Sequence, residues 1–209
     1  MAVLNIGGVA NVTWIGVGED DLLAFDTGPG NALIDDWMLT HTGKPVDAEG
    51  ACAARGTADK AALQRLMAHA YFGRQPPKSL DRNAFDPAPI EKLSKEDGAA
   101  TLTAFTAQTA AAAARHFPAP VRTWIVTGGG RRNPTLLAAL RTALPGAIVK
   151  AAEDFGWDGD ALEAQAFGYL AVRSRRNLPL SFPRTTGVAA PTLGGRYFAH
   201  PESRGRAHS

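Results

Sequence analysis

Residues 3–25, VLNIGGVANVTWIGVGEDDLLAF, decide the fold of this 209-residue chain. The first part of the stretch favours a strand that ends at Gly7-Gly8, residues 9–17 alternate loosely between two faces, and residues 22–25 form a third apolar run after a polar turn. Three such runs joined by tight turns predict an antiparallel meander of three strands.

Helices and strands alternate after this meander. Apolar residues recur at spacings of three and four, the pattern of an amphipathic helix, and short apolar runs between them favour strands. In chain order the predicted elements are a helix between Asn31 and Gly43, a helix over 98–117, a strand at 124–126 buried on both faces, a helix from Asn133 to 144, a strand at 147–149 and a helix from its cap Asp160 to 174. A meander followed by alternating elements implies an α/β fold, a mixed sheet with helices on both faces. This order is the one found in a ribonuclease-H-like domain.

Two stretches fall outside this pattern. Residues 44–97 read as an insertion with one short helix near 63–70, and residues 177–209 are dominated by Pro, Gly and Arg, which favour irregular structure. We therefore expect one ribonuclease-H-like domain over 1–176, with a helical insertion, followed by an irregular basic tail over 177–209.

The charge is unevenly distributed. The chain carries a net charge of +2, yet seven arginines and one acid, Glu202, follow Val172, so residues 1–172 are net negative. A nucleic-acid surface calls for a basic stripe on a folded face with interleaved aromatic residues. Because the basic excess lies in an irregular tail, we expect no nucleic-acid partner.

The only cysteine is Cys52, so no intrachain disulfide forms, which fits a reducing compartment. It stands among small residues and is expected to be a buried apolar group rather than a nucleophile. No apolar run approaches the roughly 18–20 residues of a membrane span, and the N-terminus lacks the pattern of a signal peptide. We expect a cytoplasmic protein with no membrane partner.

Two glycine-rich loops, at 26–31 and 127–133, each lie between a predicted strand and a predicted helix. Glycine lets a ligand approach the backbone closely, and the following helix N-terminus favours phosphate. Neither loop has the Gly-Lys-Ser/Thr ending of a Walker A motif, and neither is a dinucleotide-binding fingerprint. The alternative is a pair of tight turns without a ligand, which the further Gly7-Gly8 turn makes less attractive.

Three carboxylates have two readings each. Asp26 ends a predicted strand and holds Mg²⁺ through water, or is a turn aspartate that binds its own backbone. Asp160 and Glu163 form a capping box, or Glu163 faces a cleft and contacts substrate. No pair of histidines has metal-ligand spacing and no Gly-x-Ser-x-Gly elbow is present, so neither a zinc site nor a serine triad is expected.

Five motifs in register resemble the second lobe of the anhydro-N-acetylmuramic acid kinases. They lie at 4–13, 25–35, 76–79, 128–134 and 158–167, and the tail adds 185–188 and 194–195. The resemblance covers essentially the whole chain. It implies the actin-like, sugar-kinase and heat-shock ATPase superfamily, in which two ribonuclease-H-like lobes hold ATP and Mg²⁺ between them. It also implies the family reaction: water opens the 1,6-anhydro ring of a recycled cell-wall sugar while ATP phosphorylates its 6-oxygen, giving N-acetylmuramic acid 6-phosphate and ADP.

The resemblance also implies roles for individual residues. The glycines of the first turn and the loop at 26–30 would bind phosphate, and the second glycine loop would hold the nucleoside. Asp26 stays the candidate metal ligand because of its place at the end of a strand. Glu163 would lie on the helix that lines the pocket of the amino sugar. The candidate nucleotide-binding residues are Gly7, Gly8, Asp26, Thr27, Gly28, Gly30, Asn31, Gly128, Gly129, Gly130 and Asn133.

One departure from the family is large. Its members are nearly twice as long, with a Gly-Thr-Ser-x-Asp-Gly phosphate loop and an Asp-Phe-Arg general-base segment in the first lobe, and neither pattern occurs here. We therefore assign no catalytic residue and expect this chain alone to be inactive. It would need the missing N-terminal lobe, or form a homo-oligomer; the alternative is a non-catalytic nucleotide-binding lobe or regulator.

Overall fold

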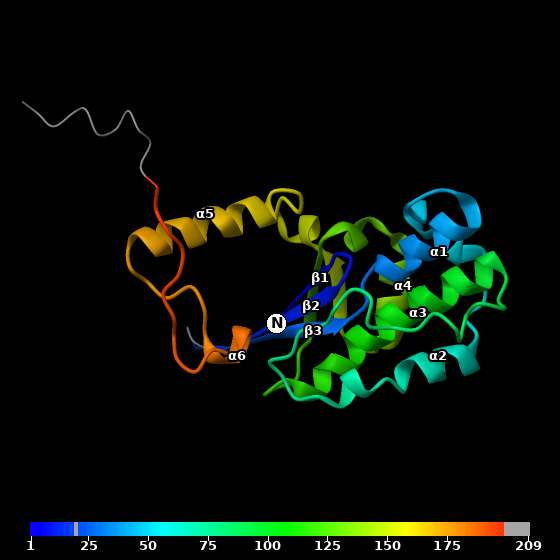
Figure 1. Cartoon of the computed structure of the whole chain (residues 1–209), viewed down its shortest axis with the longest axis horizontal. Helices are drawn as coiled ribbons and strands as arrows, with labels where there is room; N and C mark the ends of the chain where they lie inside the picture. Colours follow the sequence, from blue (N-terminus) through cyan, green and yellow to red (C-terminus); the bar gives the residue numbers. More distant parts are fainter. Residues whose placement is uncertain (19–20, 199–209) are drawn as a thin grey trace, which may run out of the picture.

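The computed structural model describes residues 1–18 and 21–198, which form a five-stranded mixed sheet in the order β3-β2-β1-β4-β5 (Figure 1). β1 pairs antiparallel with β2 and parallel with β4; β2–β3 is antiparallel and β4–β5 parallel. The strands are β1 (Ala2–Ile6), β2 (Ala10–Ile15), β3 (Leu22–Gly28), β4 (Thr123–Thr127) and β5 (Ile148–Ala151). The predicted mixed sheet and its ribonuclease-H-like order are confirmed.

The main helices follow the predicted order, with local signals at their ends. They are α1 (Ala32–Thr42), α2 (Lys60–Met67), α3 (Lys95–Ala113), α4 (Pro134–Ala143), α5 (Leu162–Arg175) and the four-residue α6 (Pro183–Thr186). α3 begins three residues before the predicted start because Ser94 Oγ accepts a hydrogen bond from the Asp97 amide at 3.1 Å. Gly43, in the left-handed region at φ +70°, ends α1 as predicted.

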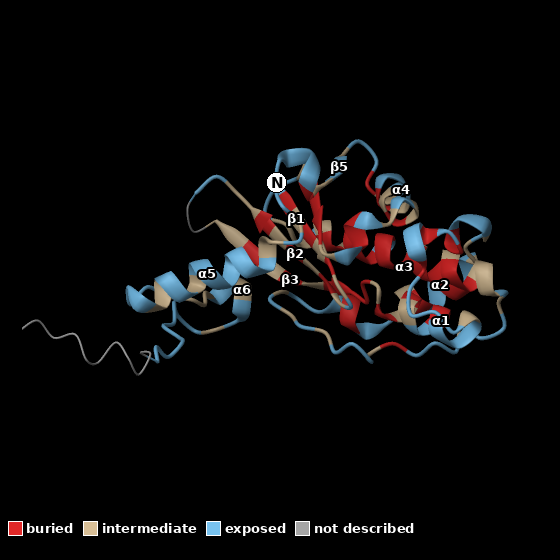
Figure 2. Cartoon of the chain, turned by 90° about the horizontal axis from the view of Figure 1, so that it is seen from above, coloured by how far each residue is buried: buried red, intermediate tan, exposed pale blue. Residues whose placement is uncertain are grey.

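One face of the sheet is covered by α3 and α4 (Figure 2). Alternate strand residues such as Leu4, Val12 and Phe25 turn toward this face and are buried against alanines of α3 and against Leu136 of α4. The many alanines of α3 let its backbone lie close to the strands. Trp124, Ile125 and Val126 are all buried, as predicted for a strand covered on both faces.

The insertion has a core of its own beside α1 and α3. It includes Tyr71, Phe72, Phe85 and Phe105, whose rings pack edge to face or stacked at centroid distances of 5.2–5.9 Å. Cys52 is buried in the same cluster, and burial raises the pKa of its thiol. The prediction of a small buried group at this position is therefore confirmed.

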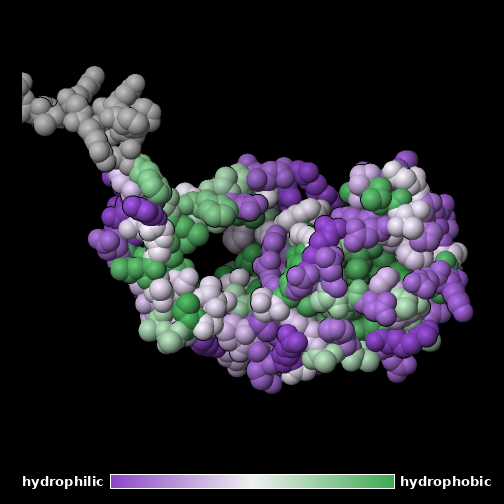
Figure 3. Space-filling model, viewed as in Figure 1, coloured by the Kyte–Doolittle hydropathy of each residue, from purple (hydrophilic) through white to green (hydrophobic). Residues whose placement is uncertain are grey.

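The other face of the sheet is only partly covered. The short α6 lies against β3, whereas α5 runs away from the sheet and contains no buried residue. Phe167 and Tyr169 of α5 are 65% and 61% exposed. Figure 3 shows an opening between this arm, formed by α5 and the tail, and the body of the molecule.

The predicted tail has little regular structure within the described residues: besides α6, a single bridge joins Ser181 and Thr192. Residues 199–209 of the predicted tail lie outside the described part of the chain. None of the helices in residues 1–18 and 21–198 combines the length and apolar character needed to cross a membrane.

Candidate functional site

The first glycine turn and the start of α1 meet at the carboxyl end of β1. The amide of Asn31 donates to Gly7 O at 2.8 Å, and the amide of Ala32 donates to Gly8 O at 3.1 Å. Gly30 adopts φ +53°, and a Cβ there would lie 2.4 Å from Gly7 O, so only glycine fits between the two turns. The two N-terminal motifs thus form one continuous backbone surface.

The second glycine loop reaches the same place from β4. Because β1 and β4 are parallel, their carboxyl ends lie at the same edge of the sheet, where ligands bind in open α/β sheets. Gly128 adopts φ +72°, and a Cβ there would lie 2.5 Å from Asn5 Oδ1. Asn31 Nδ2 donates to Ile6 O at 3.2 Å and would contact a Cβ on Gly129 at 3.8 Å. The structure therefore brings both predicted glycine loops together.

These glycines divide into two groups by what surrounds them. A Cβ on Gly28 would lie 2.3 Å from Thr109 Oγ1 of α3, and one on Gly130 would lie 2.6 Å from Ile6 Cγ2. Those two positions are small because other parts of the protein pack on them. Gly8 and Gly129 are exposed, and a Cβ at either would meet nothing closer than 3.8 Å. Gly8 and Gly129 are therefore open to a ligand, and Gly7 is partly exposed, with Val9 O as the nearest atom to a Cβ at 3.6 Å.

Asp26 and Thr27 lie within β3, although the sequence placed them in a loop. That prediction is wrong because β3 continues its pairing with β2 as far as Gly28, with an irregularity near Asn11. The buried hydroxyl of Thr27 donates to Ala10 O at 3.2 Å and holds this irregular pairing. Thr27 thus stabilises the loop's base, and the structure gives it no exposure toward a ligand.

The carboxylate of Asp26 is bound to a distant part of the chain. Its Oδ2 accepts a hydrogen bond from the Leu80 amide at 2.7 Å, and its own amide donates to Lys78 O at 3.0 Å. The reading of Asp26 as a turn aspartate that binds its own backbone is therefore wrong. Burial raises the pKa of the Asp26 carboxyl, and the Leu80 amide partly opposes this rise.

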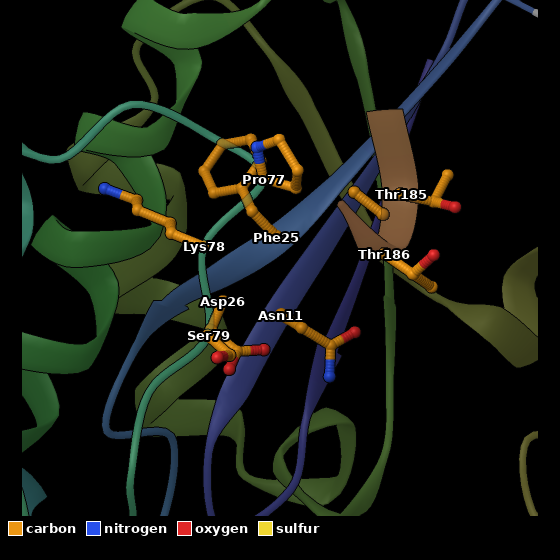
Figure 4. Close-up of a pocket in the computed structure, with 9 residues that line it drawn as sticks. Asn11, Phe25, Asp26, Pro77, Lys78, Ser79, Thr185 and Thr186 are labelled. Carbon is orange, nitrogen blue, oxygen red and sulfur yellow. The ribbon is translucent and has the colours of Figure 1, made fainter. Parts of the chain in front are cut away.

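Asp26 lines a cavity of about 300 Å³ on the less covered face of the sheet. Figure 4 shows Asp26, Ser79 and Asn11 grouped on one side, with Thr185 and Thr186 of α6 on the other. The cavity is therefore bordered mainly by hydroxyl, amide and carboxylate groups, which suit a hydroxylated ligand or a hydrated cation.

Lys78 precedes Ser79 and also lines this cavity, but the amino end of its side chain points away from it (Figure 4). Its Nζ donates to Tyr71 O at 3.3 Å and lies 4.7 Å from the centroid of the Tyr71 ring. Burial, with smaller contributions from Arg115 and Arg74, lowers the pKa of Lys78 to about 8. Lys78 thus borders the cavity, while its Nζ points away and holds this loop against Tyr71.

A row of polar side chains crosses four strands on this face, a feature that the sequence analysis missed. Asp26 pairs with Asn11, Asn11 with Asn5 and Asn5 with Thr127 in neighbouring strands. The Thr127 hydroxyl donates to Asn5 Oδ1 at 3.3 Å. The available signal was a polar residue near the same end of each predicted strand, whose alignment depends on strand order.

Asn133 is the N-cap of α4. Its Oδ1 accepts a hydrogen bond from the Leu136 amide at 2.9 Å, which confirms the predicted cap of α4. The neighbouring Thr135 hydroxyl donates to Gly50 O at 3.0 Å and joins the insertion to this helix. A contact between Asn133 and a nucleoside stays a prediction.

Arg131 is a second residue that the sequence analysis missed. It follows the three glycines of the second loop, its side chain is 5% exposed, and it donates to Gly128 O, Glu153 and Asp160. Nothing in the sequence distinguishes it from the exposed Arg132 beside it. Its burial results from the way in which residues 153–160 pass over it.

The predicted cap at Asp160 is wrong. α5 begins at Leu162 without a side-chain cap, because the carboxylate of Asp160 binds Arg131 and Arg132. Asp158 Oδ1 accepts from the Asp160 amide at 3.1 Å and closes the preceding turn. The capping box therefore does not form, and Glu163 is exposed in the first turn of α5.

Within residues 1–18 and 21–198, no three His, Cys, Asp or Glu side chains gather in a way that could hold a metal ion. A cation at Asp26 would therefore take its remaining ligands from water, amide or hydroxyl oxygens, or a phosphate. The nearby Asn11 and Ser79 are groups of this kind.

The family model and the curated relatives agree on one family. The family model "Anhydro-N-acetylmuramic acid kinase" matches residues 1–199. An anhydro-N-acetylmuramic acid kinase of Rhizorhabdus wittichii is 58% identical over 93% of this chain and 53% of its own length. One of Rhodospirillum rubrum is 57% identical over 95% of this chain and 52% of its own. The chain thus spans about half the length of the curated relatives it matches.

Among solved structures, component A of the (R)-2-hydroxyglutaryl-CoA dehydratase of Acidaminococcus fermentans is similar. It has a TM-score of 0.49 and 19% sequence identity, and the match covers 72% of this chain and 54% of that one.

Proposed function

The chain belongs to the anhydro-N-acetylmuramic acid kinase family, and from this membership we propose that it is one lobe of an ATP-dependent sugar kinase. The reaction is the opening of a 1,6-anhydro ring by water with phosphorylation of the 6-oxygen, which gives N-acetylmuramic acid 6-phosphate and ADP. The observation that carries this proposal is the meeting of three glycine turns at the carboxyl end of β1.

The backbone around Gly8 and Gly129 receives the nucleotide, because these two glycines are exposed and a ligand can come within contact of them. Phosphoryl transfer needs mainly positioning and neutralisation of charge. Mg²⁺, held through water by Asp26, supplies charge neutralisation when bound. The position of the Asp26 carboxylate supports this role, because it lines the cavity beside Asn11 and Ser79, whose oxygens suit a hydrated cation.

Glu163 contacts the amino sugar in this proposal. Its support is that the side chain is exposed in the first turn of α5 and is not part of a capping box. The polar row that ends at Asp26 provides further hydroxyl-binding groups on the less covered face of the sheet.

The isolated chain binds ATP and turns it over slowly or not at all in this proposal. It spans about half the length of its relatives, and none of its residues matches the family's general base, which must come within hydrogen-bond reach of the attacking water. The other half of the cleft comes from an N-terminal lobe or, as an alternative, from a second copy. The proposed location is the cytoplasm, with no nucleic-acid or membrane partner.

Titration calorimetry with ATP and Mg²⁺ tests the nucleotide site. Gly129→Val is the informative variant because a Cβ at Gly129 meets no protein atom closer than 3.8 Å. Gly73→Val is the matched control, since Gly73 is exposed and has nothing within 4 Å of such a Cβ. We expect Gly129→Val to weaken ATP binding by at least about tenfold and Gly73→Val to leave it unchanged. Equal affinity of all three proteins contradicts the proposed site.

A non-catalytic nucleotide-binding lobe or regulator is the second candidate, favoured by the half-length match. Mixing the chain with the unmatched half of the Rhodospirillum rubrum relative separates the two. Release of ADP that depends on the anhydro sugar supports the kinase lobe. ATP binding and complex formation without such release support the regulator.

A further inference from the structure

We propose that Arg131 is a positioning residue that fixes the first turn of α5, and with it Glu163, against the second glycine loop. Binding of a nucleotide at that loop would then reduce the mobility of the segment that carries Glu163. The fixing of α5 follows from this chain's own contacts, while the ligands at its two ends rest on the proposed function.

Arg131 uses three sides of its guanidinium at once. Nη1 donates to Gly128 O at 2.9 Å, Nε to Glu153 Oε1 at 2.7 Å and Nη2 to Asp160 Oδ1 at 2.7 Å. These groups form the Arg131 cluster. A planar group with donors in fixed directions can hold three acceptors from separate segments in one geometry, whereas the three donors of a lysine rotate freely. The cluster thus joins the glycine loop, the segment just after β5 and the turn just before α5.

The segment before α5 also packs tightly on Arg131. A Cβ on Gly159 would lie 2.3 Å from Arg131 Nε, so this close approach requires glycine. The side chains of Glu153 and Asp160 are 51% and 64% exposed, whereas that of Arg131 is only 5% exposed. Loss of the carboxylates would leave a buried charge without partners, which disfavours any separation of the segment from the loop.

α5 has little else to fix its start. It contains no buried residue, so apolar packing does not set its direction. Gly128, in contrast, is packed against Asn5 and Ile6 at the end of β1 and cannot shift without disturbing the sheet. The Arg131 cluster therefore connects a firmly held loop to a helix whose core contacts are missing, and it determines where Glu163 lies.

Arg132 offers a matched control. It is adjacent in sequence and also binds Asp160, through Oδ2, but its side chain is 65% exposed. Of the two arginines, Arg131 donates the hydrogen bonds to Gly128 and Glu153. An identical substitution at the two positions thus separates the buried connection from a surface ion pair.

Hydrogen–deuterium exchange of the full chain tests the proposal, with Arg131→Gln, Arg132→Gln and Asp160→Asn compared with the unchanged protein. Without nucleotide, we expect exchange over residues 158–165 to rise at least about tenfold in Arg131→Gln and Asp160→Asn and to stay unchanged in Arg132→Gln. Exchange in α3 should be the same in all four proteins. Asp160→Asn alters an exposed residue and keeps the test valid if Arg131→Gln does not fold.

Addition of ATP and Mg²⁺ tests the coupling. We expect protection at 128–130 in every protein, but protection at 158–165 only in the unchanged protein and in Arg132→Gln. Loop protection without protection at 158–165 in the unchanged protein overturns the coupling and leaves the nucleotide site intact. Absence of protection at both places contradicts the nucleotide site. The positioning role is overturned separately if, without nucleotide, exchange over 158–165 is the same in Arg131→Gln, Asp160→Asn and the unchanged protein.

Discussion

α3 and α5 are both long, alanine-containing helices, yet one is the centre of the molecule and the other lies apart from it. Leu102, Phe105 and Ala110 of α3 are at most 1% exposed, whereas Phe167 and Tyr169 of α5 are more than half exposed. α3 packs against the sheet, α1, α2 and α4, and α5 has no comparable neighbour in the described part of the chain. The sequence of a helix therefore determines which of its residues are apolar, but it does not determine which other element packs against them.

The two helices also begin differently. α3 begins at a serine cap, whereas α5 begins without a side-chain cap and is held by the ion pairs of Arg131. Salt does not screen apolar packing, whereas it screens ion pairs with exposed carboxylates. The attachment of α5 should therefore weaken at high ionic strength while α3 is unaffected.

Truncation of a core ring gives the largest expected difference between the helices. Phe105→Ala in α3 removes a fully buried ring and should lower the free energy of unfolding by about 3–5 kcal/mol. Phe167→Ala in α5 should change it by less than about 0.5 kcal/mol. Urea denaturation of both variants checks the comparison, and a similar loss in the two would show that α5 is covered in solution.

The glycines inside the two helices give the next largest difference. A Cβ on Gly98 of α3 would lie 2.1 Å from the Trp37 ring, so Gly98→Ala should cost about 1–3 kcal/mol of stability. A Cβ on Gly168 of α5 meets nothing within 4 Å, so Gly168→Ala should stabilise the helix by up to about 1 kcal/mol. Opposite signs in thermal unfolding are expected, and a stability loss in Gly168→Ala would place α5 against a neighbour.

Removal of side chains at helix starts gives a smaller effect. Asn133→Ala removes the cap of α4 and should lower the free energy of unfolding by about 1 kcal/mol. Glu163→Ala should leave stability within about 0.5 kcal/mol, because no capping box forms at α5. A loss of similar size in both variants, measured by urea denaturation, would restore the capping interpretation of Glu163.

The smallest expected effect concerns pH. Burial, with Asp36 adding and Arg82 opposing, raises the pKa of Asp35 in α1 to about 6. Because the folded pKa lies above the unfolded value, the ionised carboxyl disfavours the folded state at pH 7, and protonation between about pH 6 and 4 relieves this. Asp35→Asn should be more stable at pH 7 by about 1 kcal/mol or less after solvent screening, and no more stable at pH 4.

The carboxylates of the Arg131 cluster respond to acid in the opposite direction. Hydrogen bonds from Arg131 lower the pKa of Glu153 and of Asp160. These two carboxylates contribute to the free energy of unfolding above the ordinary carboxyl pKa. This contribution is lost as the pH falls through their lowered pKa values in the folded state. As the pH falls from 7 to 3, urea denaturation should therefore show first the gain in stability from protonation of Asp35 and then the loss from protonation of Glu153 and Asp160. Earlier release of α5, seen as lower amide protection factors in α5 already at pH 5 once the slower intrinsic exchange in acid is allowed for, would contradict this order.

The parts of the fold that depend on local signals could be predicted from the sequence. The meander, the cap at Asn133 and the end of α1 at Gly43 follow from strand runs and turn chemistry, and all are confirmed. Both glycine loops were identified, and their meeting at one edge follows from the parallel pairing of β1 and β4. Which of the loop residues bind a ligand stays a prediction.

The failures depend on contacts between distant segments. Asp160 was predicted as a cap because local spacing fits a capping box, but a buried arginine 29 residues earlier competes for the same carboxylate. Asp26 was placed in a loop because the apolar run ends at Phe25. The structure differs because pairing with β2 extends the strand beyond this run. The Arg131 cluster depends on three segments at once, and no periodicity in the sequence marks such a place.

The loop that binds Asp26 also protects the sheet from unwanted pairing. β3 is an edge strand, and exposed edges are templates for aggregation. The amide of Asp26 is bonded to Lys78 O, and α6 lies against the same strand. The opposite edge, β5, has only four residues and carries the exposed Lys150. One backbone amide of β3 is thus already paired, and β5 is short and charged, so both edges are poorer templates for an added strand than a long free edge would be.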